Sequence, residues 1–181
     1  MRATRSETVW HGVLTGLIGY VTVAFSVSLG DLMQGRSFFY TVSLLGEWLF
    51  YGLKDPAQVV VWPGAVLAYN GLHLVTFLAF GLLASWLVTV SERGPLLWYA
   101  ALVMYLFFFI HLFGAVLFMT EPLRSAIPML QIVAPSILAL VFMSAFLLRT
   151  HPQLRREMRE WVDDTEIDAP DAEARRPAVR S

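Results

Sequence analysis

The sequence contains no cysteine, which excludes disulfides, thiolate metal sites, iron–sulfur clusters and thiol nucleophiles. It also contains no glycine-rich phosphate loop, no nucleotide-binding fingerprint and no H-E-x-x-H metal motif. No sequence motif therefore points to an enzyme, and we predict a protein that is not one and that has no nucleic-acid partner.

Charged residues are scarce, since they make up 15% of the 181 residues against about 25% in soluble domains. Hydrophobic residues make up 57%, and the mean hydropathy is +0.61. This composition is typical of an integral membrane protein with a single membrane domain. The net charge of −1 carries little information about partners because the charges are segregated along the chain.

Long uncharged runs organise the chain. Residues 64–90 and 94–120 carry no charged side chain, and only Ser91, Glu92 and Arg93 separate them. Because about 20 apolar residues cross a bilayer, each run is long enough to span it. Similar runs follow the N-terminal residues and precede the C-terminal tail. We predict an all-α integral membrane protein whose residues 1–150 form a four-transmembrane-helix bundle with spans at about 8–30, 64–90, 95–120 and 126–148.

Two further segments are predicted to lie at the membrane surface. Residues 31–63 contain a short, aromatic-rich apolar stretch that carries Glu47, which suits an extracytoplasmic in-plane helix better than a span. Residues 151–181 begin with an apolar stripe flanked by arginines, which predicts a cytoplasmic amphipathic helix over residues 152–162. Residues 163–181 lack an apolar period and are predicted to be disordered on their own.

The distribution of arginine and lysine predicts the orientation. With both termini inside, ten of these side chains lie on the inner side and three on the outer side. The inner ones are Arg2, Arg5, Arg93, Arg149, Arg155, Arg156, Arg159, Arg175, Arg176 and Arg180, and the outer ones are Arg36, Lys54 and Arg124. Cytoplasmic loops are enriched in such residues. We therefore expect a bacterial inner membrane protein with both termini cytoplasmic and residues 31–63 outside.

Small residues recur at helical spacing along the first predicted span. Gly12, Gly16 and Gly19 lie on one face of the helix, and the first two form a G-x-x-x-G pattern. Such a face lets another helix approach closely. We predict that it packs against a helix of this chain or of another subunit rather than against lipid.

Two histidines fall within the central pair of spans. His73 and His111 lie at similar depth on either side of the turn at Glu92, and Asn70 shares a helix face with His73. Gln131 enters the fourth span at a comparable depth. Because ionisable residues inside a membrane are functional candidates, we predict a polar cluster of Asn70, His73, His111 and Gln131 in the outer half of the bundle.

This cluster allows several interpretations. The first is a pair of structural histidines that hydrogen-bond within the bundle, with no cofactor. The second is a b-type haem ligated by His73 and His111, as small helical-bundle cytochromes hold haem between two imidazoles. A metal or quinone site is the third. A three-residue turn holds its two helices about 8–10 Å apart, closer than two imidazoles that flank an iron require, and this favours the structural interpretation.

We therefore predict a non-catalytic accessory subunit of a larger bacterial membrane complex, respiratory or photosynthetic. Its partners are other membrane subunits and lipids, with quinone or pigment contacts left open. The alternative is a b-type cytochrome or a quinone-linked electron-transfer anchor. A small carrier or channel ranks third, because Asp31, Glu47 and Glu121 lie at outer turns and form no relay through the membrane. His11 and His151, at the inner ends of the first and fourth spans, are expected to be interfacial.

Overall fold

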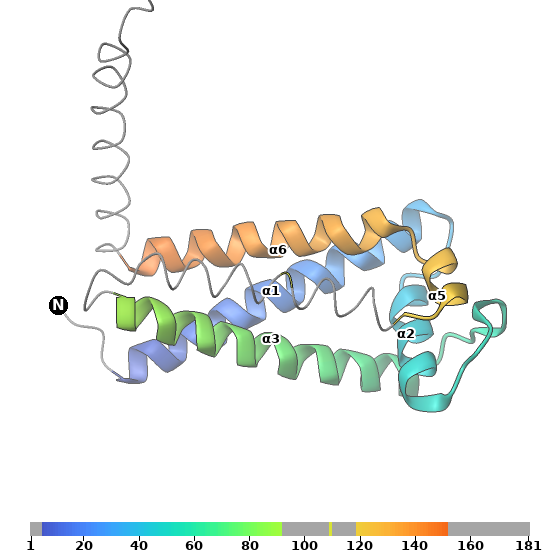
Figure 1. The fold of residues 1–181 in the computed structure, drawn as a ribbon, viewed down its shortest axis with the longest axis horizontal. Helices are drawn as coiled ribbons and strands as arrows, with labels where there is room; N and C mark the ends of the chain where they lie inside the picture. The colour runs from blue at the N-terminus through green and yellow to red at the C-terminus, as the bar shows by residue number, and fades with distance from the viewer. Residues whose placement is uncertain (1–4, 92–108, 110–118, 152–181) are drawn as a thin grey trace, which may run out of the picture.

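The computed structural model describes residues 5–91, 109 and 119–151 (Figure 1). Within these residues the elements follow the order α1 (Arg5–Met33), α2 (Tyr40–Tyr51), the short 3₁₀ helix η1 (Pro56–Gln58), α3 (Pro63–Ser91), α5 (Glu121–Ala126) and α6 (Met129–Thr150). The described part of the chain contains no β-strand, and this confirms the predicted all-helical class.

Three helices, α1, α3 and α6, are long and apolar enough to cross a membrane. α1 has no charged residue between Glu7 and Asp31, and α3 has none at all. Where water is absent, a helix satisfies nearly all of its backbone N–H and C=O groups within itself, so such runs fold as helices. The remaining predicted span, residues 95–120, lies almost wholly outside the described residues.

α1 is the central helix of the bundle. It packs against both α3 and α6, whereas α3 and α6 contact each other little. α1 runs in one direction and the other two run in the opposite direction (Figure 1). The start of α1 therefore lies beside the ends of α3 and α6, and we call this the tail end. The opposite end, where α2 and α5 lie, is the cap end.

At the cap end, α2 lies across the ends of the long helices (Figure 1). Two glycines with positive φ flank α2. Gly35 (φ 70°) lies in the preceding turn, and Gly52 (φ 74°) is the left-handed C-cap. Glycine adopts this conformation without the steric cost that a side chain imposes. Leu44 of α2 is fully buried in one apolar cluster with Leu123 and Ile127, so α2 and α5 close the bundle together.

The described cationic side chains divide between the two ends. Arg5 and Arg149 belong to the tail end, whereas Arg36, Lys54 and Arg124 belong to the cap end. The other arginines of the predicted inner side, and the predicted amphipathic tail, lie outside the described residues.

Candidate functional site

A buried carboxylate lies at the cap end. Asp31 belongs to the end of α1 and is 0% exposed. Its Oδ1 accepts hydrogen bonds from Thr41 Oγ1 (2.6 Å) and Gln131 Nε2 (2.8 Å), and its Oδ2 accepts one from the backbone N–H of Thr41 (2.8 Å). All three donors are neutral groups. These three residues join α1, α2 and α6 at one point, and we call them the Asp31 junction.

Asp31 caps the N-terminus of α2 from another helix. The residue at the N-cap position of α2, Phe39, makes no side-chain capping hydrogen bond. The first-turn N–H groups of a helix need acceptors from outside the helix. Asp31 supplies one through the N–H of Thr41. The positive end of the α2 dipole also favours a negative charge at this place, which lowers the cost of burying the carboxylate.

Gln131 completes the junction from the first turn of α6. Besides its bond to Asp31, its Nε2 donates to Thr41 Oγ1 (3.2 Å) and to the carbonyl oxygen of Val27 (3.2 Å). Its Oε1 accepts a hydrogen bond from Gln34 Nε2 (2.8 Å). Both polar atoms of this carboxamide therefore tie α6 to α1 and α2.

Asn70 and His73 lie in a separate cluster from Gln131. Asn70 Oδ1 accepts a hydrogen bond from Tyr20 Oη (3.1 Å), which links α3 to α1. At a rise of about 1.5 Å per residue, Tyr20 and Asp31 are about 16 Å apart along α1. Asn70, His73 and Gln131 were predicted to lie at one depth in the membrane. However, α6 begins at Met129, so Gln131 lies at the very end of the bundle. His111, the fourth predicted member, lies outside the described residues.

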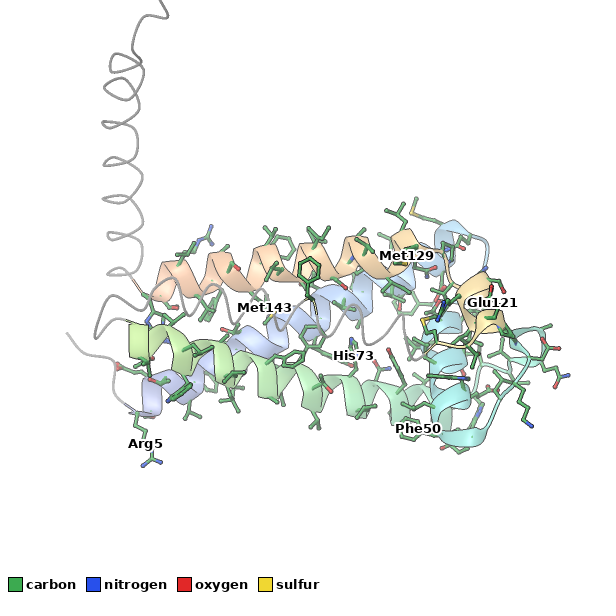
Figure 2. The ribbon with its side chains drawn as sticks, viewed as in Figure 1. Arg5, Phe50, His73, Glu121, Met129 and Met143 are labelled. Carbon is green, nitrogen blue, oxygen red and sulfur yellow. The ribbon has the colours of Figure 1, made fainter. Side chains whose placement is uncertain are left out.

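His73 lies among aromatic rings. Tyr69 stacks on it with the ring centroids 5.4 Å apart, and Phe77 meets it edge-on at 5.0 Å, one turn away on either side in α3. Tyr20 of α1 lies 6.4 Å from it. Figure 2 shows His73 near the middle of the bundle's length, on the side of α3 that faces α1. His73 therefore takes part in the packing of α1 on α3.

The glycine face of α1 meets α3. A β-carbon added at Gly16 would lie 2.5 Å from the carbonyl oxygen of Phe77, and one added at Gly12 would lie 2.8 Å from Leu82 Cα. α3 contributes Gly81, whose own β-carbon would lie 2.8 Å from Gly16 Cα. In lipid the hydrophobic effect does not drive helices together. A close backbone approach of this kind stabilises their association by van der Waals packing instead.

Gly19 and two polar contacts extend this interface. A β-carbon at Gly19 would lie 2.5 Å from Met143 Sδ, so this glycine also makes room for α6. Nearer the tail end, Ser85 Oγ donates to the carbonyl oxygen of Thr8 (2.7 Å). The hydroxyls of Thr8 and Thr89 lie 3.2 Å apart in a further hydrogen bond.

The other face of α2 holds the chain that leads into α3. Ser43 Oγ donates to the carbonyl oxygen of Val60 (3.1 Å) and accepts a hydrogen bond from the N–H of Trp62 (3.4 Å). Glu47 is 8% exposed, and its Oε1 accepts a hydrogen bond from the N–H of Val60 (3.1 Å). The buried carboxylate of α2, like that of α1, thus bonds to backbone of a neighbouring segment.

Asp31 and Thr41 were not predicted as site residues from the sequence. Asp31 was assigned to an outer turn because it is the first charged residue after the apolar run. One signal was available: a carboxylate in the last turns of a helix opposes the helix dipole, whose C-terminal end is negative. A local conflict of this kind indicates a tertiary partner. Thr41 carries no comparable signal, because threonine suits many environments.

The side chains of the Asp31 junction, the Tyr20–Asn70 pair and Ser85 therefore link neighbouring helices. No group of three or more His, Cys, Asp or Glu side chains that could hold a metal ion occurs within residues 5–91, 109 and 119–151. These contacts satisfy buried hydrogen-bond donors and acceptors in an apolar bundle. They also hold the helices in one register. Comparison with protein families, curated proteins and solved structures finds no match for this chain.

Proposed function

We propose that this chain is a non-catalytic accessory subunit of a larger bacterial membrane complex, respiratory or photosynthetic. The observation that carries the proposal is the Asp31 junction. Ionisable side chains in apolar surroundings are costly and usually serve a function. Here all three hydrogen bonds of the carboxylate hold α1, α2 and α6 together, which is a structural task.

The proposed arrangement has four spans in the bacterial inner membrane, with both termini cytoplasmic. α3 ends at the tail end and α5 begins at the cap end (Figure 1), and the uncharged residues 94–120 lie between them in the sequence. A fourth crossing by these residues is therefore part of the proposal. The concentration of arginine in the terminal segments supports a cytoplasmic tail end.

α2 is proposed to lie in the plane of the outer membrane surface. Phe50, Tyr51 and Trp62 are 48%, 54% and 38% exposed at the cap end, and the rings of Tyr51 and Trp62 are 5.0 Å apart. Aromatic side chains of this kind are enriched at the level of lipid headgroups. An in-plane α2 also explains why its polar face turns inward, toward Asp31 and Val60, rather than toward water.

The outward faces of the long helices suit an assembly partner or lipid. α1 exposes large apolar side chains along most of its length: Val9, Trp10, Leu17, Val21, Phe25, Leu29, Leu32 and Met33. None of these is charged, so the face is compatible with neighbouring membrane subunits as well as with acyl chains. The aromatic surroundings of His73 likewise support a packing role for this histidine over haem ligation.

Native electrophoresis of mildly solubilised membranes tests the proposal. We expect the tagged chain to migrate with a complex far larger than its own 20.4 kDa and to be colourless when purified alone. Migration as a free chain under conditions that preserve known respiratory complexes would contradict it. A haem absorption band that is lost in both His73→Leu and His111→Leu would replace it with the b-type cytochrome alternative.

A further inference from the structure

Two imidazoles from distant parts of the sequence meet at the tail end. His11 lies in the second turn of α1, and His151 directly follows α6. Their ring centroids are 5.3 Å apart, with an angle of 81° between the ring planes. His151 is 2% exposed, and the ring of Phe146 lies 6.3 Å from that of His11. His151 is therefore enclosed by packed side chains, and His11 lies partly buried beside it.

The separation of the rings matches two ligands of one metal ion. With metal–nitrogen bonds of about 2.0–2.1 Å and a tetrahedral angle, two imidazole centroids bound to the same ion lie about 5.2 Å apart. Two imidazoles on opposite sides of a haem iron lie farther apart, at about 6.4 Å, and the porphyrin must fit between them. The observed 5.3 Å is therefore compatible with a single ion as well as with edge-on ring packing, and it is too short for haem.

A buried nitrogen of His11 supports the same interpretation. His11 Nδ1 is buried and has no hydrogen-bond partner in the described part of the structure. A buried polar atom without a partner is unfavourable, and a bound ion that the atom ligates would remove that cost. The torsion χ2, about the bond that joins the ring to Cβ, is soft in histidine, so the two rings can adjust their orientation to a shared ion.

We propose that His11 and His151 bind a divalent transition-metal ion between α1 and α6 at the tail end. Imidazole nitrogens suit zinc, copper and nickel. Within residues 5–91, 109 and 119–151 no further His, Cys, Asp or Glu completes a group of three with the pair, so these residues supply two protein ligands. The ion would hold the first described helix, α1, to the last, α6, at the end of the bundle opposite the Asp31 junction. The proposal goes beyond the accessory role and does not depend on it.

The first experiment titrates Zn²⁺ into the purified, untagged protein in detergent by calorimetry. We expect one equivalent to bind, and we expect His11→Gln and His151→Gln each to weaken binding about tenfold or more, at least as much as loss of a supporting residue around a metal. His73→Gln is the matched control, since it removes a histidine of the same bundle far from the pair, and it should bind like the wild type. Equal binding by all four proteins, or none by the wild type, would overturn the proposal.

A further measurement keeps the proposal testable if a variant fails to fold. Electron paramagnetic resonance of the Cu²⁺-loaded wild type should show coupling to two imidazole nitrogens, and coupling to one or none contradicts the site.

Discussion

The two halves of α1 are held to their neighbours by different kinds of contact. At the cap end, Asp31 accepts three hydrogen bonds from α2 and α6, and the attachment is polar and directional. In the tail-end half, Gly12 and Gly16 lie against Gly81 of α3, and the attachment is mainly a close backbone contact, with hydrogen bonds of Thr8 to α3 beside it. The first contact fails when an acceptor is lost, whereas the second fails when an atom is added. A substitution that removes a polar group should therefore destabilise mainly the cap-end half, and one that adds a side chain should destabilise mainly the tail-end half.

The largest effect is expected at the Asp31 junction. Asp31→Ala leaves two buried Thr41 donors without their acceptor and removes one acceptor of the Gln131 amide, and unsatisfied groups of this kind cost about 1–3 kcal/mol each. We expect the free energy of unfolding to fall by about 3 kcal/mol or more, measured by SDS titration of the protein in detergent. Glu121→Ala, which removes an exposed carboxylate at the same end, is the control. Equal losses in both variants would show that the junction is not special.

The next effect tests the glycine contact. Gly16→Leu places a side chain where the α3 backbone already lies 2.5 Å from the first added carbon, so the helices must separate. Overpacking costs about 1–3 kcal/mol, and the same titration should report a loss in this range. Gly71→Leu is a close control, because a β-carbon at Gly71 of α3 meets nothing within 4 Å. If Gly71→Leu is as harmful as Gly16→Leu, helix contact does not explain the result.

A smaller loss of stability is expected when Asp31 loses one hydrogen bond but still caps α2. Thr41→Val removes the 2.6 Å hydroxyl bond to Asp31 but keeps the backbone N–H bond that caps α2. A hydrogen bond to a charged group contributes about 1.5–3 kcal/mol, so a loss near the lower value is expected. Thr76→Val removes an exposed hydroxyl that bonds only within α3 and should cost less. Proteolysis at the turn around Gly35 provides a second reading of how firmly α2 is held.

The smallest effect is expected between the two halves. Tyr20→Phe removes the hydroxyl that donates to Asn70 Oδ1, while Asn70 keeps its own bond to the carbonyl oxygen of Val66. Side-chain hydrogen bonds in membrane bundles average about 0.6 kcal/mol, and we expect a loss of this size. A loss as large as that of Asp31→Ala would mean that the Asn70 cluster, and not the cap end, holds α1 in register.

The sequence predicted the helices more accurately than the contacts between them. Uncharged runs and the bilayer thickness are enough to predict α1, α3 and α6, because length and apolarity alone determine whether a helix can cross a membrane. The end of α1 was predicted too early, at residue 30, since the rule that a span stops at the first charge assumes that the charge faces water. Asp31 has protein partners instead, and α1 continues to Met33.

The contacts of the polar residues depend on tertiary structure that the sequence does not show. Asn70 and Gln131 were predicted to share a cluster from their distance to the nearest turns. Depth along a helix does not say which way a side chain points, and a shift in a helix start moves every residue of that helix along the bundle. Gln131 consequently meets Asp31, whereas Asn70 meets Tyr20.

By itself the sequence determined that the described chain is helical, that three of its helices are long and apolar enough for a membrane, and that α1 carries a face of small residues. These properties are local, because composition and periodicity within one segment specify them. Only the tertiary structure decided that Thr41 and Gln131 surround Asp31, that Gly81 faces Gly16, and that His11 lies beside His151. Each of these contacts depends on how separate helices are rotated and offset, and no single segment encodes that information.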